Sequence, residues 1–521
     1  MKKYIKQYDK RVGKTYVYEN YPYWDKEKQQ GRAKRKLVGI WDEERQEIVP
    51  TRGTKRRTKT PNEKTKELPR FEMKHYGANH MVRWLAEDIG LVDDLAEIFP
   101  DDYEEILALA NYIVVNPESA MHLFEEWAQD HYVFNAQALN SQAISRLFQS
   151  ITVNEEQQFF QRQVNKVAKD DLLVYDTTSI SSYSDQLSDV TYGKSKDNSR
   201  LPQIKLAVLM TQKQGIPVLY RQLPGNMTDS RLVDQLIKTM AMHQLDDYQL
   251  VFDRGFYKRE NIEHLLSKGA KFVLGARIDV RFIRDHIDQV RETIDSTKHY
   301  LRSQKVYGVT VRDTTEFKAS ETSAYPMDVN IYYNHEVASI EKGTLDDQLL
   351  EWQALIEKDP SEMEACPLSR YFILEEDGVK IREDKVKAAK EYMGYFVLLS
   401  NTGHTKEEVL EIYSRKDVVE KGFHNIKDRL DMRRLRVSTD DSLRGKLFVQ
   451  FVAQIILSHL QRRLSEAKRA QLIKDKETVL GIIIKLNRIR RFTDNQGTTY
   501  KTEVLDKQKD LLKALRIQEI R

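Results

Sequence analysis

The chain has 521 residues, of which 40% are hydrophobic, and its mean hydropathy is −0.63. This length predicts roughly three to four folding units, and no apolar run is long enough to cross a bilayer, so we expect no membrane contact. A single cysteine, Cys366, excludes a disulfide framework and a cysteine zinc site. It favours a reducing, cytoplasmic compartment.

Positive charge is concentrated near the N-terminus. Residues 1–75 contain 22 Lys or Arg against 11 Asp or Glu, a net charge of +11, whereas the whole chain carries only +4. A basic arm on a near-neutral body predicts contact with a polyanion; the alternative is a merely soluble tail. The first residues lack an apolar segment, so we expect no signal peptide.

The N-terminal third divides into three predicted regions. Residues 1–50 read as a small basic β unit, because β-rich runs alternate with charged turns. Residues 51–75 have prolines, many cations and no apolar periodicity, which is typical of a basic linker. Residues 76–170 have apolar residues at helical spacing and are interpreted as a helical DNA-binding domain. Within it, 141–147 is a candidate recognition helix; the alternative is an ordinary bundle helix.

From residue 171 the pattern changes to short apolar strands and helices. The predicted order is strand, hairpin of two strands, helix, strand, helix, strand, and this is the order of an RNase H-like fold. Asp176 ends the first strand, at 172–176, and Asp253 ends the fourth, at 248–253. These strands are neighbours in that fold, and the carboxyl end of a sheet is the usual place for a site.

The predicted fold class is therefore α/β, with an interrupted core. We expect its first part at 171–284 and its second part at 391–464. The intervening 285–390 is too long for a loop and reads as a β-containing insertion subdomain. Residues 465–521 read as a mostly helical tail.

A helix is predicted to begin after Thr405 as N-cap. Its residues 412–427 form a charged stretch. At 100° per residue, four polar side chains fall within about 60° of arc: Tyr413, Lys416, Glu420 and Lys427. A carboxylate flanked by cations suits a metal ion beside a phosphate. The alternative is a solvated face with i,i+4 ion pairs.

Three carboxylates are thus candidate metal ligands and catalytic residues: Asp176, Asp253 and Glu420. Carboxylate oxygens suit Mg²⁺. Two such ions about 4 Å apart activate a water or a 3′-hydroxyl and stabilise the leaving oxygen, which permits in-line attack on a phosphodiester. Lys416, Lys427 and Tyr413 are candidate phosphate ligands. The alternative for the first two acids is that each only starts a turn.

Four motifs in this order resemble bacterial DDE transposases of the insertion-sequence-four superfamily. They are DTTS at 176–179, LPGN at 223–226, FDRGFY at 252–257 and the helix at 413–427. The family pattern is Tyr-x2-Arg-x3-Glu-x6-Lys, and the departure here is Lys416 in place of Arg, which keeps the charge but loses the bidentate fork. The resemblance covers roughly residues 171–460, and through these motifs Arg254 and Asn226 join the candidate DNA contacts.

The resemblance implies a DNA transposase of an insertion sequence, acting in the bacterial cytoplasm at the nucleoid. It implies binding of terminal inverted repeats, cut-and-paste cleavage and strand transfer through a hairpin intermediate, and a homodimer that pairs two ends of double-stranded DNA. Two Mg²⁺ ions are implied as cofactors, with Mn²⁺ as a substitute. Relatives hold a flipped base on an aromatic residue of the insertion, for which Trp352, Tyr307 and Tyr333 are candidates.

Two other readings stay open. One is an RNase H-like nuclease that cleaves without joining. The other is a catalytically inactive DNA-binding protein derived from a transposase, against which the three acids argue.

Overall fold

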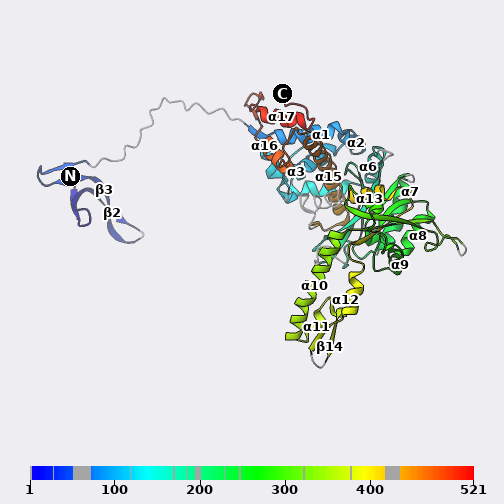
Figure 1. Cartoon of the computed structure of the whole chain (residues 1–521). Coiled ribbons are helices and arrows are strands. Elements are labelled where there is room, and N and C mark those ends of the chain that lie inside the picture. The colour runs from blue at the N-terminus through cyan, green and yellow to red at the C-terminus, as the bar shows by residue number, and fades with distance from the viewer. Residues whose placement is uncertain are drawn as a thin grey trace. The chain divides into compact units, whose positions relative to one another are not determined.

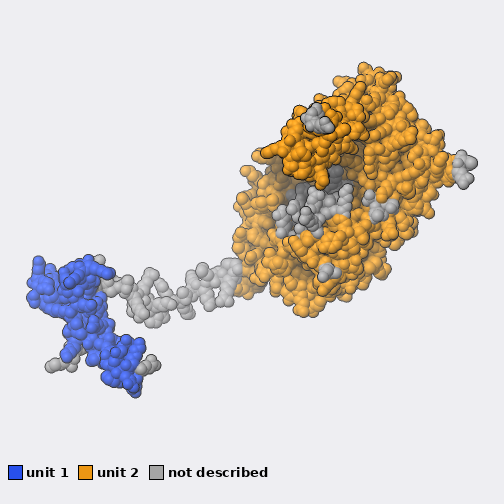
Figure 2. Space-filling model, turned by 90° about the horizontal axis from the view of Figure 1, so that it is seen from below, with its two compact units in different colours: residues 1–70 blue, residues 71–521 orange. Residues whose placement is uncertain are grey.

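The computed structural model of the protein forms two compact units, residues 1–70 and 71–521 (Figure 2). The residues it describes are 3–26, 28–50, 72–117, 119–167, 171–184, 186–193, 201–227, 229–245, 248–320, 323–375, 378–416 and 435–520.

The first unit contains a four-stranded antiparallel sheet in the order β1-β2-β3-β4. Strands β2 and β3 are long and remain paired from Thr15 and Trp41 out to Asp25 and Gln30. Both are visible in Figure 1. The strands are β1 (Lys3–Asp9), β2 (Lys14–Asp25), β3 (Gln30–Asp42) and β4 (Glu47–Val49).

The second unit is built on a sheet of nine described strands in the order β11-β12-β13-β16-β10-β9-β6-β7-β8. Strand β7 is antiparallel to its neighbours β6 and β8, and β9 and β10 run parallel to β6. Most residues of β6 and β7 are buried, as expected for apolar strands covered on both faces. The strands are β6 (Leu173–Ser181), β7 (Gln203–Thr211), β8 (Pro217–Pro224), β9 (Gln249–Phe252), β10 (Lys271–Gly275), β11 (Tyr300–Leu301), β12 (Val306–Asp313), β13 (Met327–Tyr333) and β16 (Tyr395–Ser400).

Strand β6 is longer than the sequence predicts. We expected it to end at Asp176 and a polar loop to follow, but it continues to Ser181. The reason is its second neighbour: β7 pairs with β6 as far as Gln203 opposite Ser181, whereas β9 pairs with it only up to Tyr175. The first acid therefore lies inside β6 but directly beyond the end of its pairing with β9.

Helices lie between or after the strands of this sheet in the chain. The long α15 is buried along much of its length and packs against α3, α5 and β8. None of the described helices is both long and apolar enough to cross a membrane. The sheet-associated helices are α7 (Asp229–Met242), α8 (Arg259–Ser267), α9 (Arg281–Val290), α13 (Lys406–Ser414) and α15 (Asp440–Arg469).

The segment between β10 and β16 contributes to the main core and to two smaller hydrophobic clusters. Strands β11, β12 and β13 extend the main sheet. A separate cluster that includes Leu345, Leu349 and Phe372 forms a second small core, in the lobe that projects from the sheet in Figure 1. Its elements are α10 (His335–Lys358), α11 (Glu362–Ala365), β14 (Phe372–Glu375), β15 (Gly378–Ile381) and α12 (Glu383–Lys390).

The helical region before the sheet shares the core with α15. The ring of Phe448 on α15 lies 5.1 Å from that of Phe99 and 5.0 Å from that of Phe159. A capping box between Thr152 and Glu155 starts α6. The helices are α1 (Gly77–Asp88), α2 (Leu91–Ile98), α3 (Tyr103–Val115), α4 (Phe124–Asp130), α5 (Ser141–Ser150) and α6 (Val153–Asn165).

The C-terminal tail returns to the start of this unit. Strand β17 pairs with β5, so that Arg490 lies opposite His75, and with β18 on its other side. The elements are β5 (Glu72–His75), α16 (Val479–Leu486), β17 (Arg490–Thr493), β18 (Thr499–Lys501) and α17 (Asp506–Ala514).

Candidate active site

Asp176 and Asp253 follow the last paired residues of two adjacent parallel strands. Tyr175 on β6 is in register with Phe252 on β9, and each is followed by an aspartate. Adjacent strands lie about 4.8 Å apart, and neighbours in register on parallel strands point to the same face of the sheet. The two aspartates therefore occupy neighbouring backbone positions just beyond the β6–β9 pairing, while the aromatic rings before them lie 6.2 Å apart in the core.

Asp253 is held by two donors from the end of α13. The Tyr413 hydroxyl donates to Oδ1 of Asp253 at 3.0 Å, and the Lys416 Nζ atom donates to the same oxygen at 2.7 Å. The Lys416 ammonium also lies 4.8 Å from the centre of the Tyr413 ring. A positive charge therefore already lies beside this carboxylate.

These contacts set the ionisation of the group. Burial alone would raise the pKa of Asp253, but the Lys416 ammonium, the backbone N–H of Arg254 and the Tyr413 hydroxyl outweigh it and hold the pKa below its ordinary value. Burial and the neighbouring Asp253 carboxylate raise the pKa of Tyr413 to about 12. At neutral pH, Asp253 is thus an anion and Tyr413 a neutral donor.

Gly275, at the end of β10, makes room for this contact. A Cβ atom at this position would lie 2.4 Å from the Tyr413 hydroxyl and 3.1 Å from the backbone nitrogen of Arg254. Any side chain at position 275 would therefore push Tyr413 away from Asp253. The predicted strand at 271–275 includes this glycine, but nothing in the sequence marks it as part of the site.

The helix that carries Tyr413 differs from the prediction. Thr405 does cap it, with a capping box to Glu408, but α13 ends at Ser414 and does not continue through Lys416. The Lys416 N–H bonds to the carbonyl of Tyr413, three residues back, which is the tightened bond typical of a helix end. The predicted Glu420 and Lys427 lie outside the described residues.

The other two predicted DNA contacts lie on loops after strands. Arg254 is exposed and begins the short 3-10 turn after β9. Asn226 is exposed in the loop after β8, where its backbone N–H donates to the Thr191 hydroxyl at 2.9 Å.

A groove of about 840 Å³ opens beside Asp253. It runs from the ends of β9 and β10 along β16 to the first turns of α10, and Tyr413 and Lys416 line one end of it. Sequence reasoning missed the lining residues in and next to α10 and β16, which include the N-cap Asn334, Glu341 and Gly394. They come from sequence positions 81 to 141 residues away from Asp253.

The three aromatic residues considered for a flipped base lie in two places. Tyr307 and Tyr333 are directly opposite one another on β12 and β13, and both rings contact the ring of His335. Trp352 packs against the second core.

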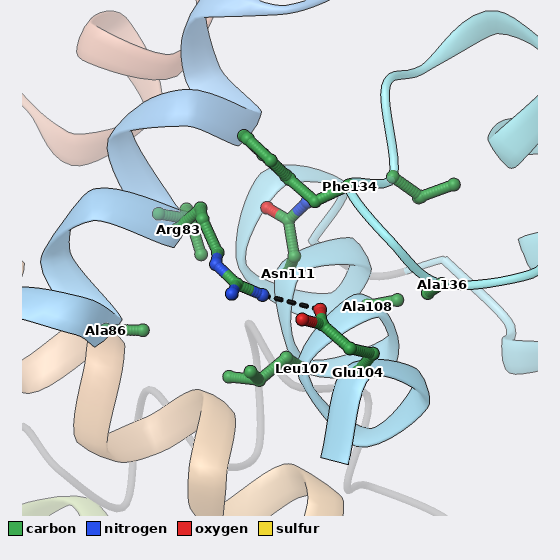
Figure 3. Close-up of a pocket in the computed structure, with 10 residues that line it drawn as sticks. Arg83, Ala86, Glu104, Leu107, Ala108, Asn111, Phe134 and Ala136 are labelled. Carbon is green, nitrogen blue, oxygen red and sulfur yellow. Dashed lines mark hydrogen bonds and ion pairs between the residues drawn. The ribbon is translucent and has the colours of Figure 1, made fainter. Parts of the chain in front are cut away.

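A second, much smaller cavity in the helical region has a structural explanation. It measures about 20 Å³ and is bordered by Arg83 and Glu104, which form an ion pair at 2.5 Å (Figure 3). Apolar side chains of α1 and α3 make up much of the remaining wall. This cavity is a packing gap beside a partly buried ion pair.

Asp176 and Asp253 supply part of the set of oxygen ligands that a hard cation needs. Asp176 and Asp253 offer carboxylate oxygens, the ligands Mg²⁺ prefers, and the ammonium at Asp253 shows that this position favours positive charge. Among the described residues, no group of three His, Cys, Asp or Glu could hold a metal ion. The third predicted ligand, Glu420, is not among those residues.

Comparison with known proteins identifies the family. A family model described as "Transposase DDE domain" matches residues 168–456, whereas a search of curated proteins finds no match. Among solved structures, the chain resembles a piggyBac transposase synaptic complex with hairpin DNA, at 10% identity, with 79% of this chain and 76% of that chain covered and a TM-score of 0.37. It also resembles a Mos1 transposase paired-end complex with the left transposon end, at 14% identity, with 39% and 56% covered and a TM-score of 0.13. Since the family model spans more than half of the chain, the protein belongs to the transposase DDE domain family.

Proposed function

We propose that this protein is the DNA transposase of an insertion sequence, which binds terminal inverted repeats and catalyses Mg²⁺-dependent cleavage and strand transfer by cut-and-paste. The observation that supports this proposal best is that Asp176 and Asp253 each follow the last paired residue of two adjacent parallel strands, β6 and β9, and that Asp253 accepts from the Lys416 ammonium just beyond α13. Family membership supports the same reading.

In this proposal, Asp176, Asp253 and Glu420 hold two Mg²⁺ ions, with Mn²⁺ as a substitute. The ions, when bound, supply the activation of the attacking hydroxyl and the stabilisation of the leaving oxygen of a phosphodiester. Lys416 and Tyr413 keep Asp253 ionised and oriented, so that its carboxylate is ready to accept a cation. Lys416, Lys427, Arg254 and Asn226 bind the DNA backbone by charge and hydrogen bonds.

We further propose an RNase H-like core and membership of the insertion-sequence-four group. Support for the core comes from the strand order β8-β7-β6-β9-β10, in which three antiparallel strands are extended by parallel ones. Support for the group comes from the spacing of Tyr413, Lys416, Glu420 and Lys427. A homodimer that pairs two DNA ends, and a hairpin intermediate, complete the proposed reaction.

The test uses purified protein and DNA that carries the element's own ends. We expect Asp176→Asn, Asp253→Asn and Glu420→Gln each to abolish Mg²⁺-dependent cleavage, because each removes a carboxylate charge, while DNA binding in a mobility-shift assay remains. Asp359→Asn, which alters an exposed acid of the projecting lobe, is the matched control and should cleave normally. Full cleavage by any of the three site variants would show that the site assignment is wrong.

A second readout separates transposition from simple cleavage. Incubation of the wild-type protein with ends and a plasmid target should yield joined products, and denaturing gels should reveal a hairpin on the excised end. Cleaved ends that never join would instead identify a nuclease.

A further inference from the structure

The strand registers of the first unit's sheet show which of its side chains share a face. Residues directly opposite one another in an antiparallel pair share a face, and the registers of β1, β2 and β3 therefore sort every side chain. One face carries four tyrosines: Tyr4, Tyr8, Tyr21 and Tyr23. We call it the tyrosine face.

These tyrosines do not form a core. They are between 41% and 60% exposed. Among the described residues of this unit, only Val17, Glu19 and Gly39 are buried. Four large rings thus remain at the surface of a sheet that has little core of its own, which is typical of a surface that contacts a partner.

The same face carries a cluster of cations: Lys6, Arg32, Lys34 and Lys36. Lys6 lies over the Trp41 ring at 2.9 Å and Lys34 over the Tyr23 ring at 5.7 Å, rather than against a carboxylate of a described residue. The acids on this face are Glu19, which is buried, and Asp25, which pairs with Arg32 at 3.6 Å. The exposed part of the tyrosine face is therefore mainly aromatic and positive.

The charge of the whole segment has the same sign. Residues 1–70 contain 21 Lys or Arg and 10 Asp or Glu, a net charge of +11. Because positive residues outnumber negative ones about two to one, the complementary partner is an acidic macromolecule.

We infer that the tyrosine face binds the sugar–phosphate backbone of double-stranded DNA, separately from the catalytic groove. Lysine ammonium groups neutralise phosphates and release counterions, and tyrosine hydroxyls donate to phosphate oxygens while the rings pack against sugars. A ribbon of two β-strands such as β2 and β3 has the width that the major groove admits. The choice of duplex DNA as partner rests on the proposed function. The positive charge and the exposed rings are observations that do not depend on that function.

The experiment measures binding of the full-length protein to a labelled duplex of arbitrary sequence by fluorescence anisotropy over a series of salt concentrations. The double variant Lys34→Gln, Lys36→Gln should lower the slope of log affinity against log salt by about 2, since each phosphate contact contributes roughly 0.9. Tyr21→Ser with Tyr23→Ser should weaken binding at all salt concentrations and leave that slope unchanged.

The matched control is the double variant Lys3→Gln, Lys14→Gln. It removes the same charge from exposed residues of the same sheet, but from the opposite face, and should leave the slope within 0.5 or so of the wild-type value. An equal loss of slope in the control, no loss in the Lys34 and Lys36 variant, or tighter binding to a single strand of the same sequence would overturn the inference. Circular dichroism confirms that each variant is folded.

Failure of this inference and failure of the proposed function are distinguishable. All binding measurements are repeated in Asp253→Asn protein, in which the cleavage site is inactivated, and the same loss of slope should appear. Binding by the tyrosine face together with no cleavage by the wild-type protein would contradict only the proposed function.

Discussion

The Nζ atom of Lys416 lies 2.7 Å from Oδ1 of Asp253, the oxygen that also accepts from the Tyr413 hydroxyl. The two residues are 163 positions apart in the sequence. This contact joins the end of α13 to the end of β9, and it brings a cation to the carboxylate that we propose as a metal ligand.

Replacing Lys416 tests the strength of this contact. The coupling between Lys416→Met and Asp253→Asn in a double-mutant cycle should be below about 1 kcal/mol, because the Asp253 side chain is 43% exposed and solvent screens the pair. The coupling should shrink further at 1 M salt. Unfolding in urea measures it, and a coupling of several kcal/mol would contradict this account of a solvent-screened pair.

Gly275→Ala should disturb the site from β10, the strand next to β9. Its new Cβ would lie 2.4 Å from the Tyr413 hydroxyl, and the resulting shift should cost about 1–3 kcal/mol of stability. Adding Tyr413→Phe, which removes the hydroxyl, should recover much of that loss. Gly255→Ala is the control, because a Cβ at position 255 meets nothing within 4 Å. Equal destabilisation by both alanine variants in urea unfolding would refute the steric argument.

The crossing of α5 and α15 depends on a second glycine. A Cβ on Gly445 would lie 2.1 Å from the carbonyl oxygen of Phe148, so Gly445→Ala must separate the two helices and should cost on the order of 1–3 kcal/mol. In contrast, Gly343→Ala in α10 meets open space and should stabilise by about 0.5–1 kcal/mol, since alanine is the better helix former. Thermal and urea unfolding measure the change in stability that each of the two variants causes. A neutral Gly445→Ala would mean that the helices do not touch at this point.

Stability should fall as the pH rises from about 4.5 to 7, because of Glu156. Burial raises the pKa of this carboxyl to about 7, against the opposing hydrogen bond from the Tyr220 hydroxyl. The folded state then binds a proton that the unfolded chain has already released, so stabilisation is complete below the unfolded pKa and is lost through the folded one. The loss amounts to about 3 kcal/mol.

The variant Glu156→Gln keeps an acceptor oxygen but cannot ionise. It should match the wild-type free energy of unfolding near pH 4.5 and exceed it by about 3 kcal/mol at pH 8. Urea unfolding at several pH values gives both curves. Parallel curves would show that Glu156 titrates normally in the folded protein.

Periodicity was sufficient to predict many individual elements. The capped start of α13 at Thr405 and the neighbouring positions of the two acid-bearing strands are both present in the structure. A local signal, a capping residue followed by glutamates, carried the first prediction, and the order of the predicted strands and helices, which is that of an RNase H-like fold, carried the second.

Two predictions were wrong for reasons that lie outside the local sequence. Strand β6 extends past Asp176 because β7, a distant segment, supplies its hydrogen bonds. Helix α13 ends at Ser414, although the charged stripe fits a helix through residue 416. Periodicity reports which residues suit a helix, but it does not fix the residue at which the helix ends.

The sequence by itself determined the acids, their order along the chain and the concentration of positive charge before residue 71, because these are properties of residue identity and spacing. Only the tertiary structure decided that Tyr413 and Lys416 share one oxygen of Asp253, that Gly275 leaves room for them, and that β1 and β2 present four exposed tyrosines on one face. Each of these relationships depends on strand register and on contacts between residues far apart in sequence, and such contacts are fixed by packing and backbone pairing rather than by local pattern.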